Sequence, residues 1–158
     1  MRVDLPDLAA MARFGAAIAE RLQPGDVVAL SGGLGAGKTT LARAIIAALG
    51  HAGEVPSPSF SMVEAYDPPA VRLPLVHADF YRLADPREAE ELGLDDYRAG
   101  AALVAEWPEH AGGFADEPAC LSIALDSAGS GRFAIVESGE AWLGRLPCPC
   151  LCPLGYRP

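Results

Sequence analysis

Residues 32–40 read Gly32-Gly33-Leu34-Gly35-Ala36-Gly37-Lys38-Thr39-Thr40 and match the pattern G-x-x-x-x-G-K-[ST]. In this pattern the backbone N–H groups of a glycine-rich loop surround the phosphates of a nucleotide, and the lysine reaches the β- and γ-phosphates. Lys38 is the only lysine of the chain, and Thr39 and Thr40 are its only threonines. Elsewhere the chain uses arginine as its long cationic residue and serine as its aliphatic hydroxyl residue, so lysine and threonine occur in this loop alone. The stretch therefore predicts a binding site for a nucleoside triphosphate.

The segments on either side of this loop supply the structural setting that the pattern requires. Residues 26–30 are mostly apolar and favour a strand, and residues 41–49 repeat apolar side chains at helical spacing. A strand, loop and helix in this order direct the helix N-terminus at a bound anion. Gly32, Gly35, Ala36, Gly37, Lys38, Thr39 and Thr40 are thus the candidate nucleotide-binding residues.

The remaining chain alternates between strand and helix patterns. Residues 5–22 place apolar side chains on one helical face, with Asp4 or Asp7 as N-cap, and residues 86–92 suit a short helix. Strands are predicted over residues 60–66, 75–81, 103–107, 121–125 and 132–136, the last two forming a C-terminal strand pair. We predict an α/β fold similar to P-loop NTPases, with a central, mostly parallel sheet flanked by helices.

Length and composition limit the class of protein. A chain of 158 residues suits one domain, predicted here over residues 1–143, followed by a Cys/Pro-rich and disordered tail over residues 144–158. The C-x-C-x-C spacing of Cys148, Cys150 and Cys152 is not that of a zinc site. No apolar run reaches the roughly 20 residues of a membrane span, and no secretion signal is evident, so we expect a cytoplasmic protein. The net charge of −9 opposes direct binding of nucleic acid.

Two predicted strands end on an acid, Asp79 after residues 75–78 and Glu106 after residues 103–105. Ligands of open α/β sheets lie at the carboxyl ends of the strands. Cleavage of a triphosphate needs Mg²⁺ and a group that positions the attacking water, so we predict that one acid serves the metal and the other serves the water. Spacing alone leaves both assignments open, as well as a solvated acid or a salt-bridge partner at either position.

The absence of one sequence motif indicates which nucleotide base is bound. GTPases use an Asn-Lys-x-Asp element, which a chain with a single lysine lacks, so adenine is favoured. Arg132 is either a ligand of the nucleotide base or a surface arginine, and Arg82 is either a phosphate ligand or part of a surface ion pair. His77 is interpreted as a locally hydrogen-bonded strand residue, and Trp107 as a core residue that could instead stack on a ligand.

Four segments in this order resemble one family: residues 33–41 (GLGAGKTTL), 57–60 (SPSF), 77–83 (HADFYRL) and 106–109 (EWPE). Together they resemble the small bacterial ATPase of tRNA threonylcarbamoyladenosine biosynthesis, the TsaE (YjeE) family, over residues 4–137. The loop motif is shared by many NTPases, whereas the combination is specific. Gly33 and Ser59 depart from the family pattern, which usually has Asp and Thr at these positions.

The resemblance implies an ATPase that works with TsaB- and TsaD-type subunits, the pair that transfers threonylcarbamoyl to adenosine 37 of tRNA. Contact with tRNA would run through these proteins. It also implies that Thr39 and Glu106 hold Mg²⁺, that Asp79 serves catalysis or switching, and that residues 57–59, with Ser57 and Ser59, form a mobile segment that senses the γ-phosphate.

Two other functions fit a phosphate loop. A small-molecule kinase is disfavoured because such enzymes bring several arginines on a lid, and here the arginines are scattered singly. A nucleotide-sensing switch with little turnover stays open, although two acids at strand ends favour chemistry.

Overall fold

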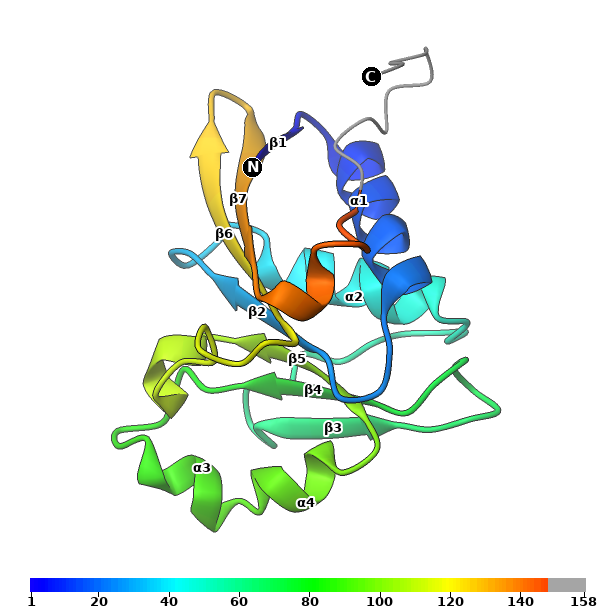
Figure 1. Ribbon diagram of the computed structural model, residues 1–158. Coiled ribbons are helices and arrows are strands. Elements are labelled where there is room, and N and C mark those ends of the chain that lie inside the picture. The colour runs from blue at the N-terminus through cyan, green and yellow to red at the C-terminus, as the bar shows by residue number, and fades with distance from the viewer. Residues whose placement is uncertain (148–158) are drawn as a thin grey trace.

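The structure, a computed structural model, describes residues 1–147, which form one mixed sheet with helices on both faces (Figure 1). The strands are β1 (Arg2–Leu5), β2 (Val27–Ser31), β3 (Val63–Tyr66), β4 (Leu75–Asp79), β5 (Ala102–Glu106), β6 (Cys120–Ala128) and β7 (Gly131–Ser138). The helices are α1 (Leu8–Arg21), α2 (Lys38–Ala48), α3 (Arg87–Glu91) and α4 (Leu94–Arg98), with 3-10 turns η1 (Pro108–Ala111) and η2 (Glu140–Trp142).

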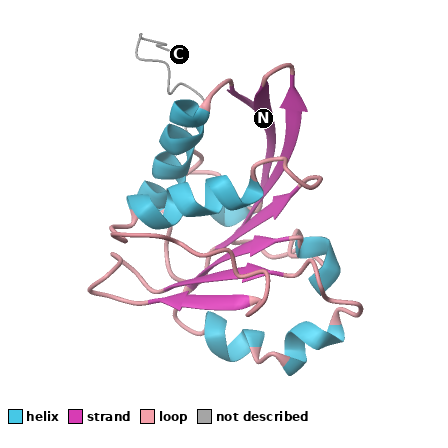
Figure 2. Ribbon diagram, turned by 180° about the vertical axis from the view of Figure 1, so that it is seen from behind, coloured by secondary structure: helices cyan, strands magenta, loops and turns pink. Residues whose placement is uncertain are grey.

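The sheet has the order β1-β7-β6-β2-β5-β4-β3. Its four central strands, β6, β2, β5 and β4, are parallel to one another, whereas β3 runs antiparallel to β4 at one edge. Strands β6 and β7 form a hairpin, and β1 closes the other edge antiparallel to β7 (Figure 2). The predicted α/β fold with a C-terminal strand pair is therefore confirmed.

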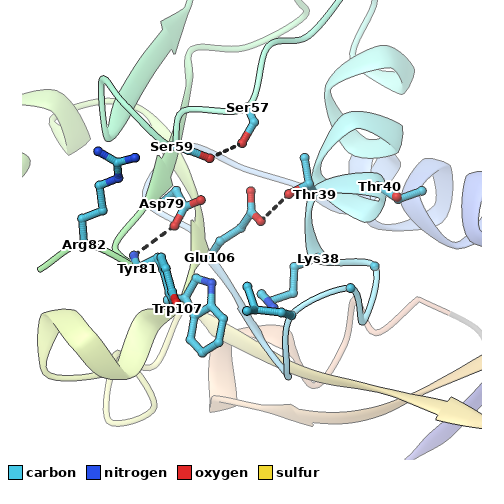
Figure 3. A pocket seen from close by; sticks show the side chains of 13 residues that line it. Lys38, Thr39, Thr40, Ser57, Ser59, Asp79, Tyr81, Arg82, Glu106 and Trp107 are labelled. Atoms are coloured by element: carbon cyan, nitrogen blue, oxygen red, sulfur yellow. Dashed lines mark hydrogen bonds between the residues drawn. The ribbon is translucent and has the colours of Figure 1, made fainter.

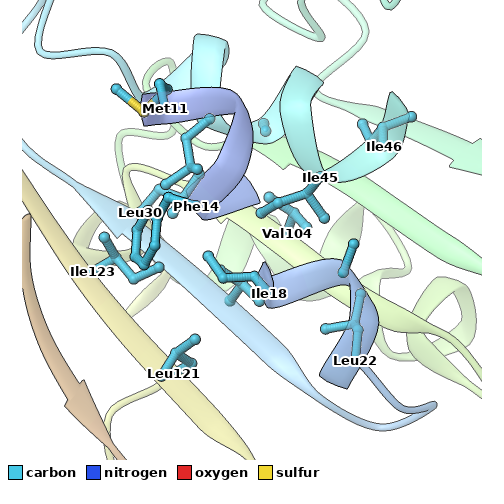
Figure 4. Packing of buried hydrophobic residues seen from close by; sticks show 14 of the residues in the cluster. Met11, Phe14, Ile18, Leu22, Leu30, Ile45, Ile46, Val104, Leu121 and Ile123 are labelled. Atoms are coloured by element: carbon cyan, nitrogen blue, oxygen red, sulfur yellow. The ribbon is translucent and has the colours of Figure 1, made fainter. Parts of the chain in front are cut away.

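The central strands are buried on both faces, which explains their unbroken apolar runs. In β2, Val28 and Leu30 belong to the cluster under α1 and α2, whereas Val27 and Ala29 belong to the cluster on the opposite face. The first cluster is centred on α1 side chains such as Phe14, which pack between β2 and α2 (Figure 4). The second cluster takes side chains from α3, α4 and the loops beside them.

Helices α1 and α2 cross very closely. A Cβ atom added at Gly15 would lie 2.5 Å from the Cβ of Ala44, so only glycine allows this approach. The close crossing seats α2 firmly on the sheet. Because α2 begins at Lys38, it also fixes the position of the phosphate loop.

The ends of several elements differ from the sequence analysis. Leu5, assigned there to the first helix, is the last residue of β1, and α1 begins at Leu8 with Asp7 as its N-cap. The Asp7 carboxylate accepts a 2.7 Å hydrogen bond from the N–H of Ala10, so Asp7 rather than Asp4 is the cap. Residues 60–62 precede β3 instead of belonging to it, and helix α4 was not predicted. The β6–β7 turn consists of residues 129–130 alone, because both strands extend further than expected.

The chain stays anchored beyond residue 143, where the sequence analysis placed the end of the domain. Arg145 forms two hydrogen bonds with the buried carboxylate of Asp26, at 2.7 and 2.8 Å, and a third with the carbonyl of Arg21. The predicted disorder is thus wrong for Arg145, while Cys148, Cys150 and Cys152 lie outside the described residues. None of the helices within residues 1–147 is long and apolar enough to cross a membrane.

Candidate functional site

The loop between β2 and α2 has the backbone geometry of a phosphate-binding loop. Gly32, Gly35 and Gly37 adopt φ angles of 136°, 75° and 106°, a region that side chains with a Cβ rarely enter. The loop and the first turn of α2 form one wall of a pocket of about 460 Å³. The N-terminus of α2 therefore opens into a cavity large enough for a phosphate chain.

Lys38 is held in place before any anion enters. Its ammonium donates 2.7 Å hydrogen bonds to the carbonyl oxygens of Gly32 and Gly33, and it lies 4.3 Å from the ring centre of Trp107. Burial lowers the pKa of Lys38 below its ordinary value, although nearby Glu106 and Asp79 oppose the shift. A phosphate group in the pocket would offset this desolvation, so binding and the charge of Lys38 favour each other.

The two predicted acids reach the same pocket from neighbouring strands. Asp79 and Glu106 are paired positions at the ends of the parallel strands β4 and β5. Alternation along each strand places both residues, together with His77, on the face that α2 covers. Asp79, Glu106, Lys38 and Thr39 all line the cavity (Figure 3).

Thr39, Glu106 and His77 form a chain of hydrogen bonds. The Thr39 hydroxyl donates to Oε1 of Glu106 at 2.7 Å, and Nε2 of the fully buried His77 lies 2.7 Å from Oε2 of the same carboxylate. An ionised carboxylate only accepts hydrogen bonds, so Nε2 of His77 is the donor in this contact, and Nδ1 has no partner within residues 1–147. His77 was expected to bond locally, but its partner lies 29 residues away. The result is that both oxygens of Glu106 are fixed in direction.

The donor set fits Mg²⁺ brought by a nucleotide. Mg²⁺ prefers oxygen ligands and is usually held by one or two protein oxygens together with phosphate oxygens and waters. A hydroxyl and a carboxylate joined at 2.7 Å supply two such oxygens at the phosphate loop. The described residues contain no group of three or more His, Cys, Asp or Glu side chains able to hold a metal without other ligands.

Asp79 is a buried carboxylate, which suits a group that handles protons. It is 7% exposed, and burial raises its pKa above the ordinary value, while a 3.0 Å hydrogen bond from the N–H of Tyr81 acts in the opposite direction. Because the carboxylate lines the pocket beside Glu106, the two predicted acids meet where the sequence analysis expected them.

Ser57 and Ser59 lie on the opposite wall of this pocket, where their hydroxyl groups share a 2.7 Å hydrogen bond (Figure 3). Arg132 lies elsewhere. It lines an adjoining cavity of about 220 Å³ on the other side of the loop, between α1 and the β6–β7 turn, and its guanidinium donates to the carbonyl of Gly35. Gly35, Gly37 and Thr40 border both cavities.

Other residues of the pocket lining include Trp107 and Arg82, for which the sequence analysis left a contact with the ligand open. Trp107, expected in the core, is half-buried and packs against Tyr81 and the ammonium of Lys38, and its φ of 55° is unusual for a bulky residue. Leu34, Tyr81 and Arg82 complete the lining. Of these residues, Tyr81 was not assigned a role from the sequence, and its place two residues after Asp79 was the signal that could have identified it.

Comparison with known proteins agrees with this geometry. The family described as "Threonylcarbamoyl adenosine biosynthesis protein TsaE" matches residues 5–134, most of the chain. The chain belongs to the TsaE family. A TsaE protein of tRNA threonylcarbamoyladenosine biosynthesis from Haemophilus influenzae is 40% identical over 119 residues, covering 72% of this chain and 74% of that protein. Another from Mycobacterium leprae is 42% identical over 101 residues, covering 60% and 63%.

A solved structure extends the TsaE likeness to the fold. The crystal structure of YdiB from Bacillus subtilis superimposes with a TM-score of 0.71 and 28% identity, covering 90% of this chain and 88% of that one. The expected resemblance to the TsaE family is thereby confirmed, and with it a place in tRNA threonylcarbamoyladenosine biosynthesis. The phosphate loop of this TsaE protein indicates nucleotide binding.

Proposed function

We propose that this TsaE protein is a Mg²⁺-dependent ATPase that works in the cytoplasm with TsaB- and TsaD-type subunits in the modification of tRNA adenosine 37. One observation carries the proposal. A single pocket brings together the loop lysine, the Thr39–Glu106 pair and the protonatable carboxylate of Asp79. A phosphate ligand, a metal site and a group for the attacking water are the parts that ATP cleavage requires.

Each residue takes a distinct role in this proposal. Lys38 and the N–H groups of residues 35–40 bind the phosphates. Thr39 and Glu106 would hold Mg²⁺, which would supply neutralisation of the phosphate charge. His77 keeps the Glu106 carboxylate oriented. Asp79 orients the water whose oxygen bonds to the γ-phosphorus and accepts its proton, a role that a raised pKa favours.

The adjoining cavity is the proposed binding place of the nucleotide base. It is lined by the apolar side chains of Leu5, Leu8 and Met11 and by Arg132, and it meets the phosphate pocket at Thr40. Apolar walls with one cationic rim suit a stacked purine. We propose adenine rather than guanine because the chain lacks the Asn-Lys-x-Asp element of GTPases.

Membership of the family and the charge of the chain support the proposed partners and an indirect contact with tRNA. A chain of net charge −9 gains little from direct contact with phosphate backbones, so protein subunits are the proposed route to the tRNA.

The test is ATP turnover by the purified protein, alone and with TsaB- and TsaD-type subunits and tRNA. We expect slow hydrolysis alone and faster hydrolysis with the partners. Lys38→Ala should abolish ATP binding in calorimetry because the cation directed at the phosphates is removed. Unchanged affinity in that variant, or a parent protein that binds ATP without any turnover under either condition, would contradict the proposal.

A further inference from the structure

A second cationic side chain lies at the phosphate pocket. Lys38 and Arg82 are the two cationic residues that line it, and they approach from different elements, Lys38 from α2 and Arg82 from the loop that follows β4. Arg82 lies three residues after Asp79, so the end of β4 and the loop that follows it bring a carboxylate and a guanidinium to the same pocket (Figure 3).

The surroundings of Arg82 do not give it a structural role. Within residues 1–147, Arg82 forms no ion pair and donates no hydrogen bond, so the surface ion pair considered from the sequence is not found there. Nearby Arg87, by contrast, pairs with Asp85 at 3.2 Å. The guanidinium of Arg82 is therefore not committed to a carboxylate within these residues.

The contact that Arg82 does make is a weak and exposed one. Its guanidinium lies 4.5 Å from the ring centre of Phe60, and that ring is 84% exposed. An exposed cation–π contact contributes only about 0.5–1 kcal/mol, which a charge-assisted hydrogen bond to phosphate exceeds. Phe60 directly follows Ser59 of the opposite pocket wall, so this contact holds Arg82 at the edge of the pocket. Because the contact is weak, little free energy is needed to move the guanidinium toward a bound phosphate.

We propose that Arg82 stabilises the transition state of ATP cleavage by binding the γ-phosphate oxygens, as an arginine finger supplied by the chain itself. This assignment rests on the proposed ATPase function. The water oxygen bonds to the γ-phosphorus, and the bond between that phosphorus and the bridging oxygen breaks, with its electron pair leaving on ADP. The proton of the water passes to Asp79, while Arg82 transfers no proton and meets the negative charge on the equatorial oxygens.

Lys38 does not make a second cation unnecessary. Its ammonium is bound to two loop carbonyls and covered by Trp107, which fits a ligand of the bound phosphates. Arg82 is exposed and bound only to a ring, so its side chain is free to follow the charge that develops during cleavage.

The experiment compares the parent with Arg82→Ala and with the matched control Arg87→Ala, an exposed arginine outside the pocket. Calorimetry measures the affinity for MgADP and for MgADP with fluoroaluminate, which mimics the transferred phosphoryl group. We expect all three proteins to bind MgADP within about twofold. Arg82→Ala should bind the fluoroaluminate complex about 10³-fold more weakly and hydrolyse ATP about 10³-fold more slowly, the lower limit for an arginine finger. Millimolar guanidinium chloride should restore part of this hydrolysis, which a folding defect would not allow.

The outcomes separate the assignment from the proposed function. A parent that forms no fluoroaluminate complex and turns over no ATP would overturn both. If the parent forms the fluoroaluminate complex and hydrolyses ATP, and Arg82→Ala equals it in both measurements, the assignment alone would be overturned. Loss of partner-stimulated turnover only, with normal hydrolysis by the isolated Arg82→Ala protein, would also overturn it, because Arg82 would then contact a partner rather than phosphate.

Discussion

Gly32, at the junction of β2 and the phosphate loop, should tolerate no side chain. Its φ of 136° is unfavourable for an L-residue, and a Cβ there would lie 2.4 Å from the carbonyl oxygen of Leu125 in β6. Backbone strain of about 1–2 kcal/mol and overpacking of about 1–3 kcal/mol give an expected loss of about 2–5 kcal/mol in unfolding free energy for Gly32→Ala. That loss is a large part of the roughly 5–15 kcal/mol that stabilises a typical domain.

Two neighbouring glycines provide graded controls. Gly33 is not in the left-handed region and has open space around its Cβ position, so Gly33→Ala should change the unfolding free energy by less than about 0.5 kcal/mol. Gly35 has a φ of 75° but no atom within 4 Å, so Gly35→Ala should lose about 1 kcal/mol from strain alone. Urea unfolding followed by circular dichroism measures all three. Equal midpoints for Gly32→Ala and Gly33→Ala would refute the geometry of the loop.

Three further predictions concern the acids and the C-terminal anchor. Burial raises the Asp79 pKa, so the folded state favours the protonated acid, and this stabilising contribution is lost as the pH rises through the raised pKa. Asp79→Asn should therefore unfold at a higher urea concentration than the parent at pH 7, and this difference should shrink as the pH falls toward 3.8, the ordinary pKa of an aspartate. The variant should also bind ATP without hydrolysing it. A parent that is more stable than the variant at pH 7 would contradict the stability prediction. Glu106→Ala should weaken the Mg²⁺ dependence of hydrolysis more than nucleotide affinity, and superimposable metal titrations of variant and parent would exclude Glu106 as a ligand. Arg145→Ala should lower the unfolding free energy by about 3 kcal/mol, because the buried Asp26 carboxylate loses its partner. Arg2→Ala, which removes an exposed ion pair, should lower it by about 0–1 kcal/mol. Similar losses in urea unfolding of both variants would show that the Arg145–Asp26 pair is not buried.

Local patterns were sufficient to predict the parts of the site that are continuous in sequence. The phosphate loop depends on glycines at fixed spacing between a strand and a helix, and β2 and α2 have the predicted places. Asp79 and Glu106 were predictable because acids at the ends of buried parallel strands must meet at one edge of the sheet.

Features that depend on strand register or on distant contacts were not predictable. The bond between His77 and Glu106 exists because β4 and β5 pair in one register, which single strands do not reveal. Leu5 fits a helical face as well as an edge strand, and only its pairing with Arg132 across β1 and β7 decides between them. Arg145 looked unanchored because its partner Asp26 lies 119 residues earlier.

The solitary lysine has a practical consequence for measuring occupancy. Lys38 carries the only side-chain amine of the chain, and it lines the pocket proposed for the phosphates. Acylating reagents would therefore modify one side-chain nitrogen, and a bound triphosphate would shield it. The mass of a single proteolytic fragment would then report what fraction of the molecules in a sample held nucleotide when the reagent was added.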